Sequence, residues 1–312
     1  IYRRGTHIVE PIADCRVQHK ALTQFGVRVR ELLPKLGVPA YDETRDRGVL
    51  RAVRARVMAK SGELLVGAVT TAADFAGRDR LAEALWNAAQ GLRDDQGRKL
   101  TPVGVALNVN PKPGNALLGA ETFALRGRDW QQEPVGAHTL RVSFPSFWQL
   151  HRHADAILFR PALQLLGDVT GLEIVDGYGG VGAFAVRLLD RGAARVVLIE
   201  SSSSACADAR ENLQAPDFAG RATVDERPFG AAPLPRCDLL LADPPRAGLL
   251  ADGAAAVLAN APPRILLVSC SLPSLGRDLQ ALASHYRVRH FQLCDLFPHT
   301  EHVEGLTLLE RR

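Results

Sequence analysis

The chain has 312 residues, of which 46% are hydrophobic and 23% charged, a balance typical of a globular protein with a sizeable core. This length favours two packed units over one small domain. No apolar run approaches the roughly 18 residues that a membrane span needs, and the five cysteines lack CxxC spacing, so we expect no membrane association, no disulfide framework and a cytoplasmic location.

The net charge of +4 is unevenly distributed along the chain. Residues 1–60 contain 13 Lys and Arg against 6 Asp and Glu, a net +7, which leaves −3 for the rest. A basic N-terminal part suits a phosphate-bearing partner, because long-range attraction to nucleic acid is mostly electrostatic. However, 33 of the 38 basic residues are arginine, so a solvated, arginine-rich face explains the asymmetry equally well.

The first part of the chain is predicted to form a small α+β unit. The stretches 47–59 and 62–70 are strand-like and are joined by a turn at Lys60–Gly62. Residues 74–92 carry apolar side chains at helical spacing, and the pattern stops near Gly91. Another strand, VGVALNVNP, ends at Pro111.

From about residue 171 the pattern changes to a strict alternation of apolar strands and helices. The predicted strands end at Asp176, Glu200, Asp243 and Cys270. Such an alternation indicates a parallel sheet with helices on both faces. Ligands of these sheets bind beyond the carboxyl ends of the strands, so four chemically capable side chains are predicted to share one rim.

A glycine-rich turn, DGYGGVG, follows the first of these strands at residues 176–182. Glycines let the backbone approach a ligand closely at the start of a helix, and an acid at Glu200 suits a ribose diol. A dinucleotide site or a ligand-free turn would look similar, so the motif alone is a weak signal. Ala185 stands where a pyrophosphate-binding GxGxxG turn has its third glycine, which favours S-adenosylmethionine.

Two further motifs lie at the ends of the next two strands. In ADPPRAGL, two prolines after Asp243 fix a rigid turn and direct the carboxylate into the cleft. Methyltransferases that act on exocyclic amines of bases use a related turn with an aromatic residue where this chain has Arg246, which weakens that interpretation. Cys270 directly precedes a predicted helix, where a lowered thiol pKa is expected. A lone cysteine is more commonly a core residue, but its place on the rim favours chemistry.

Four motifs occur in order along the chain: DGYGGVGAF, ADPPRAGL, VSCSLPSLGRDL and DLFPHTEHVEGLTLL. Together they resemble the RNA (uracil-5-)-methyltransferases, which modify 23S ribosomal RNA and the T-loop of tRNA. FPSFWQL, at residues 144–150, resembles the Ser-Phe-Phe-Gln segment of that family, and YDETRDRGVLRAVRAR and LNVNPKPGNALLGAE resemble its central domain. The resemblance implies an α/β fold: a Rossmann-like class I S-adenosylmethionine-dependent methyltransferase domain over residues 141–312, after a smaller α+β, RNA-binding central domain over residues 1–140.

The resemblance also implies the roles of individual residues. Cys270 would be the nucleophile and Glu304 the base, with no metal ligand. The cofactor and uridine pocket would be lined by Gln149, Tyr178, Glu200 and Asp243. The chemistry agrees, because uracil C5 becomes nucleophilic only after a thiolate adds at C6, and the C5 proton must later leave to a base. Two alternatives stay open: methylation of an exocyclic base nitrogen through the DPPR turn, and a catalytically degenerate RNA-binding protein.

Four positions depart from the family pattern. Gly179 replaces a common cysteine, Ala183 an Asn or Thr, His151 an Asn, and Ser271 an Asn that often follows the nucleophile. We expect these changes to affect the cofactor geometry and turnover but not the type of reaction.

Cys15 resembles the fourth ligand of the iron–sulfur cluster that many ribosomal members carry. A four-iron cluster requires four thiolates, so we expect no iron–sulfur cluster in this chain, although the element-like start at Ile1 suggests further N-terminal sequence. Cys15 and the YDET segment favour 23S ribosomal RNA over tRNA as the partner. A monomer is the expected oligomeric state.

Overall fold

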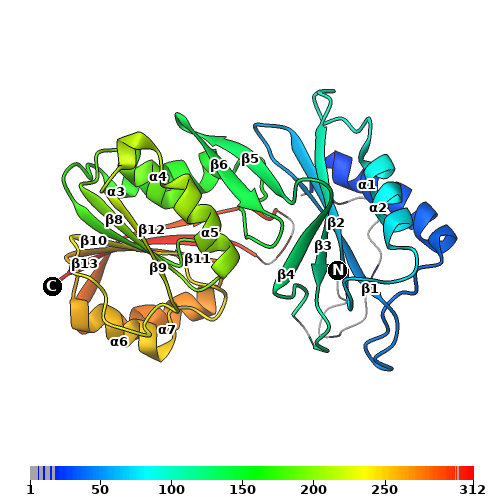
Figure 1. Ribbon diagram of the computed structural model, residues 1–312. Helices are drawn as coiled ribbons and strands as arrows, with labels where there is room; N and C mark the ends of the chain where they lie inside the picture. Colours follow the sequence, from blue (N-terminus) through cyan, green and yellow to red (C-terminus); the bar gives the residue numbers. More distant parts are fainter. Residues whose placement is uncertain are drawn as a thin grey trace. The chain divides into compact units, whose positions relative to one another are not determined.

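The computed structural model describes residues 6, 10, 15, 18–114, 116–298, 300 and 302–312. The chain forms two compact units, Ile1–Gln131 and Gln132–Arg312 (Figure 1). The expected division after residue 140 falls inside strand β6 (His138–Ser143). Val135 and Leu140 are buried in the core of the second unit, which is why the division lies earlier. Within the described part of the chain, no helix is long and apolar enough to cross a membrane.

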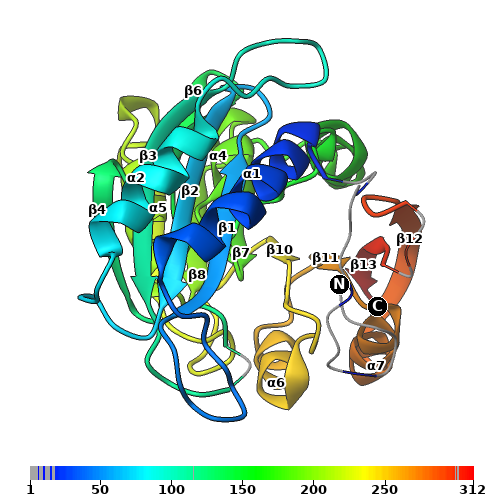
Figure 2. The same cartoon turned by 90° about the vertical axis from the view of Figure 1, so that its right-hand side faces the viewer.

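The first unit is a four-stranded sheet with two helices on one face (Figure 2). Its elements are α1 (Lys20–Leu36), β1 (Leu50–Val57), β2 (Glu63–Thr70), α2 (Arg78–Ala89), β3 (Thr101–Val109) and β4 (Glu121–Gly127). The predicted hairpin is confirmed, since β1 and β2 pair antiparallel, and β3 lies parallel to β2 after the α2 crossover. Helix α1 was not among the predicted elements. It buries Ala21, Phe25 and Val29, which are spaced four residues apart on one face. Gly37, in the left-handed conformation, caps its C-terminus.

Several arginines of the basic N-terminal segment are used inside this unit. Arg28 donates hydrogen bonds to two carbonyls at the end of α2. Arg51 donates to three carbonyls of the loop 110–114, and Arg56 Nε lies 2.6 Å from Oε1 of Gln131. Only part of the local positive charge is therefore available to a partner.

The second unit contains a seven-stranded sheet in the order β12-β13-β11-β10-β7-β8-β9, in which β13 runs antiparallel to its neighbours. Helices α3, α4 and α5 cover one face and α6 and α7 the other (Figure 1). Strand β5 (Trp130–Val135) spans the boundary between the units and pairs with β6. The strands of the large sheet are β7 (Glu173–Gly177), β8 (Arg195–Glu200), β9 (Ala222–Glu226), β10 (Leu239–Ala242), β11 (Arg264–Ser269), β12 (Tyr286–Cys294) and β13 (Glu304–Arg311). The helices are α3 (Arg160–Leu166), α4 (Ala183–Asp190), α5 (Ser203–Asn212), α6 (Leu250–Asn260) and α7 (Leu272–Leu282), with a π-helical turn, η1 (Asp155–Phe159), and a 3-10 turn, η2 (Pro216–Phe218).

The alternation predicted from residue 171 onward is confirmed. Strands β7, β8, β10 and β11 pair parallel with one another, and β10 is buried along its whole length, as expected for a strand covered on both faces. Helix α5 begins at the predicted serine cap, since the Ser202 side chain accepts a hydrogen bond from the Ala205 amide.

One buried group in this sheet allows a test of the packing. Thr307 in β13 is fully buried, and its Oγ1 has no hydrogen-bond partner among the described residues. We expect Thr307→Val to raise the free energy of unfolding in urea by about 1 kcal/mol, because it removes an unsatisfied polar atom at nearly constant shape.

Thr70→Val is the matched control for this prediction. Thr70 is equally buried, but its Oγ1 donates to the carbonyl of Ala72 at 2.8 Å. Its loss should lower the free energy of unfolding by about 1 kcal/mol. A Thr307→Val protein that is destabilised as much as the control would contradict the prediction.

Candidate functional site

The carboxyl ends of four adjacent parallel strands bring the predicted rim residues together. Glu200 is the last residue of β8, while Asp243 and Cys270 directly follow β10 and β11. Strand β13 runs in the opposite direction beside β11, with Gly305 opposite Ser269. Its first residue, Glu304, therefore lies at the same rim as Cys270.

Glu200 holds the glycine-rich turn through its carboxylate. One oxygen accepts a hydrogen bond from the Gly180 amide at 3.0 Å, and the other accepts from the amides of Ser201 and Ser202 at 2.7 Å each. Gly180 has a φ of 55°, a left-handed conformation that favours glycine. The turn between β7 and α4 is thus fastened to the end of β8.

The packing around Gly179 explains one departure from the family pattern. A Cβ atom at this position would lie 2.5 Å from Cγ of Leu198 and 3.1 Å from Cγ of Asp176. A cysteine here would force Leu198 to move. Glycine at position 179 is therefore matched to the leucine at position 198.

One cavity unites three of the four predicted cofactor residues. Phe147–Gln149 form one wall, and Tyr178–Val181 with Ala183 and Phe184 form the other, with Asp243 also lining the cavity. The fourth residue, Glu200, bonds to Gly180 of the second wall. The cavity is partly open to solvent and has a free volume of about 60 Å³.

Tyr178 closes the turn with an aromatic contact. Its ring lies 4.8 Å from that of Phe229, and its hydroxyl is 3.5 Å from the carbonyl oxygen of Leu249. Burial, with a smaller contribution from the charge of Asp278, raises the pKa of Tyr178 to about 12. The phenol is therefore neutral and can donate a hydrogen bond.

Two buried acids lie below and beside the cavity. Neither carboxylate oxygen of Asp176 makes a hydrogen bond with the described part of the chain. Burial raises the pKa of Asp176 to about 7. The nearby Ala185 amide lowers this pKa in part, although it is not placed to form a hydrogen bond with the carboxylate. Burial raises the pKa of Asp243 well above its usual range, and the charges of Glu304 and Asp176 add to that effect. Both carboxyl groups are thus shifted toward their protonated form.

The expected lowering of the Cys270 pKa is wrong. Helix α7 begins at Leu272 with Ser271 as its cap, so Cys270 lies just outside the helix. Burial raises the pKa of Cys270, and the charges of Glu304 and Asp243 raise it further, while Arg246 opposes them. The protonated thiol is therefore the resting form.

Arg246 is a site residue that the sequence indicated only as a missing aromatic. It lines a second cavity with Cys270, Ser271 and His302, and its Nη2 lies 3.4 Å from Nε2 of His302. Burial raises the pKa of Glu304, and Arg246 lowers it. The position of Arg246 directly after the two prolines was the sequence signal that could have identified it as a site residue.

The remaining expectations concern the fourth motif, metal binding and the iron–sulfur cluster. His299 and Glu301 of the fourth motif lie outside the described residues. Among the residues that are described, no group of three or more His, Cys, Asp or Glu side chains could hold a metal ion. The absence of an iron–sulfur cluster stays a prediction, and Cys15 has a free thiol.

Comparison with known proteins identifies the relatives of this chain. The family model described as tRNA (Uracil-5-)-methyltransferase matches residues 235–312, which include Asp243, Cys270 and Glu304. An uncharacterized RNA methyltransferase of Bacillus cereus is 32% identical over 319 residues, covering 100% of this chain and 67% of the relative. One of Halalkalibacterium halodurans is 30% identical over 316 residues, covering 99% and 66%. The chain thus spans about two thirds of the length of these relatives.

A solved structure supports the fold over nearly the whole chain. The tRNA (uracil-54, C5)-methyltransferase of Pyrococcus abyssi, in complex with S-adenosyl-L-homocysteine, matches with a TM-score of 0.73 and 23% identity, covering 99% of this chain and 72% of that one. The second unit accordingly has the Rossmann-like class I methyltransferase fold, as predicted. With the relatives at 30% identity and above and the family model over the catalytic end, the chain belongs to the RNA (uracil-5-)-methyltransferase family.

Proposed function

We propose that this chain carries the catalytic part of an S-adenosylmethionine-dependent enzyme that methylates carbon 5 of a uridine in RNA. The observation that carries the proposal is the meeting of Cys270, Glu304 and Asp243 at one rim, because β13 returns beside β11. A nucleophile, a base and a further carboxyl group are the side chains that this reaction needs.

The groove between Phe147–Gln149 and the glycine turn is the proposed cofactor site. When bound, S-adenosylmethionine supplies an electrophilic methyl group. Gln149 and Tyr178 offer polar contacts from opposite walls. Within the described part of the chain, the Glu200 oxygen that bonds to Gly180 accepts one hydrogen bond, so it keeps a lone pair for a ribose hydroxyl.

Cys270 acts on the uridine before the methyl transfer. Its thiol loses a proton to water, and the thiolate adds to C6 of the ring. The electrons of the C5–C6 double bond move toward O4, which makes C5 a nucleophile for the methyl group. Asp243, whose pKa is raised well above its usual range, can donate a hydrogen bond to O4 in its protonated form.

Glu304 acts after the methyl transfer. Its carboxylate takes the proton from C5, the C5–C6 double bond forms again, and the Cys270 thiolate leaves. Burial raises the pKa of Glu304, and a carboxylate with a raised pKa is a stronger base than an exposed one. Methylation of an exocyclic nitrogen needs neither residue, and Arg246 stands where such enzymes have an aromatic side chain.

RNA binding is proposed for the first unit, with 23S ribosomal RNA favoured over tRNA. Exposed basic residues remain there after the internal arginines are set aside: Lys20, Arg30, Lys35, Arg45 and Arg47. The resemblance of Cys15 and the YDET segment to ribosomal members supports the ribosomal substrate. Comparing methyl transfer to 23S ribosomal RNA and to tRNA transcripts tests this choice.

We expect Glu200→Ala to weaken S-adenosylhomocysteine binding by about 1–3 kcal/mol, the usual cost of losing a charged hydrogen bond. Isothermal titration calorimetry measures this directly. Glu173→Ala, at the opposite end of the same sheet, is the control and should bind normally. Unchanged affinity in Glu200→Ala would remove this residue from the site.

The raised pKa of Cys270 predicts slow alkylation by iodoacetamide at pH 8, with a midpoint above the ordinary thiol value of 9.0. Glu304→Gln removes a negative neighbour, which lowers the thiol pKa and should speed the reaction; Arg246→Gln should slow it. Mass spectrometry of the tryptic peptide 265–277, whose only cysteine is Cys270, follows the modification. A midpoint below that of glutathione would contradict the assigned electrostatics.

Variants of the two proposed catalytic residues should stop the reaction at different steps. Glu304→Gln keeps the shape but cannot take the proton, so the methylated RNA should stay attached to Cys270 and survive denaturing electrophoresis. Turnover should fall at least ~100-fold, since positioned proton transfer typically contributes that much. Cys270→Ala and the double variant should give no adduct. An adduct or C5 methylation by Cys270→Ala would exclude the covalent mechanism.

A further inference from the structure

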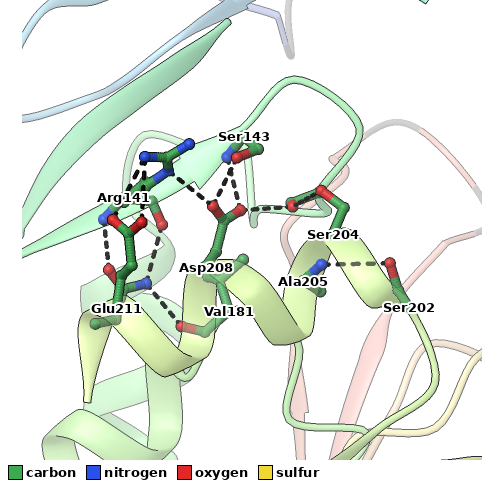
Figure 3. A network of polar contacts seen from close by, with 10 residues as sticks. Arg141, Ser143, Val181, Ser202, Ser204, Ala205, Asp208 and Glu211 are labelled. Atoms are coloured by element: carbon green, nitrogen blue, oxygen red, sulfur yellow. Dashed lines mark hydrogen bonds and ion pairs between the residues drawn. The ribbon is translucent and has the colours of Figure 1, made fainter. Parts of the chain in front are cut away.

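Helix α5 carries buried polar side chains that the proposed reaction does not use (Figure 3). Asp208 is 1% exposed and Asn212 is 8% exposed. Burying a carboxylate is costly unless hydrogen bonds satisfy it. The partners of these two residues therefore show what the helix holds in place.

Asp208 is bound on both of its oxygens to the end of β6 and the segment after it. Oδ1 accepts from Nε of Arg141 at 3.2 Å and from Oγ of Ser143 at 2.6 Å. Oδ2 accepts from the amide of Ser143 at 2.7 Å and from Oγ of Ser146 at 2.6 Å. Ser204, one helical turn before Asp208, lies 2.8 Å from Ser146 through their hydroxyl oxygens (Figure 3).

Ser146 directly precedes the first wall of the groove, Phe147–Gln149. Residues 144–153, all of which are described, contain no helix or strand. Phe147 is 72% exposed, so burial of its own side chain does not fix the path of the wall. Trp148 packs against the hydrophobic core of the second unit, and the side-chain bonds of Ser146 to α5 hold the start of the wall.

Asn212 holds the other wall. Its Nδ2 donates to the carbonyl of Val181 in the glycine turn at 2.9 Å and to the carbonyl of Arg141 at 2.9 Å. Its Oδ1 accepts from the amide of Arg141 at 2.7 Å. One helix is thus bonded to the segment that leads to Gln149 and to the turn that faces it.

We propose that Asp208 and Asn212 are positioning residues that set the width of the groove, with Asp208 responsible for the wall that carries Gln149. This inference rests on the proposed function of that groove. Charge-assisted hydrogen bonds to a buried carboxylate make a rigid support. Gln149 and the glycine turn line the same cavity, so a displacement of either wall changes the distance between the groups that would contact a ligand.

Glu211 provides a matched control on the same helix. Its carboxylate pairs with the same arginine, 3.4 Å from Nη1 of Arg141, but Glu211 is exposed, whereas Asp208 is buried and bonds to Ser143 and Ser146. Asp208→Ala and Glu211→Ala therefore each remove one carboxylate from Arg141, and only the first releases the wall.

Calorimetric titration with S-adenosylhomocysteine separates positioning from stability. Loss of folded protein lowers the stoichiometry at unchanged Kd, whereas a displaced wall raises Kd at unchanged stoichiometry. Asp208→Ala should raise Kd at least ~10-fold, because a displaced wall would lose at least one hydrogen bond to the ligand. Glu211→Ala should stay within about 2-fold of the wild type, as expected for an exposed ion pair.

Ser146→Ala keeps the test decisive if Asp208→Ala does not fold, because it removes only the bond at the wall itself and should also raise Kd. Folded Asp208→Ala or Ser146→Ala with the Kd of the wild type would overturn the inference. A wild-type protein that does not bind S-adenosylhomocysteine would instead overturn the proposed function.

Discussion

Three carboxyl groups lie at one rim of the seven-stranded sheet and are partly or wholly buried: those of Asp176, Asp243 and Glu304. Removal from water raises the pKa of each, and their mutual repulsion adds to this for Asp243. Burial therefore shifts each group toward its protonated form. In the proposed reaction, the protonated form of Asp243 donates a hydrogen bond to a carbonyl, and the ionised form of Glu304 is a stronger base than an exposed carboxylate.

The same electrostatics govern the nucleophile. Burial raises the pKa of Cys270, the charges of Glu304 and Asp243 raise it further, and Arg246 lowers it, so the thiolate fraction depends on burial and on a balance between two acids and one cation. Arg246 also lowers the pKa of Glu304. The guanidinium thus acts on both proposed catalytic residues from the position after the two prolines. In this account, a resting thiol protects Cys270 until a substrate enters.

The part of the site that could be predicted from the sequence depends on local patterns. Apolar runs that end at Glu200, Asp243 and Cys270 mark the ends of parallel strands, and such strands share one rim. Glu304 came only from the resemblance, because its place beside Cys270 depends on the long-range pairing of β13 with β11. The predicted direction of the Cys270 pKa shift was wrong for a similar reason. The start of a helix is a local pattern, whereas the burial of the thiol and the nearby charge of Glu304 depend on the tertiary fold. Asp208 was not predicted, since its serine partners lie more than 60 positions away.

The central claim is methylation at carbon 5 of uridine, and tritium release tests it most directly. RNA labelled with tritium at C5 of uridine is incubated with the protein and S-adenosylmethionine, and released tritium is compared with methyl groups incorporated. The account predicts one tritium released for each methyl group, with neither observed for Cys270→Ala. Methyl incorporation without tritium release would place the methyl group elsewhere on the base and contradict the account.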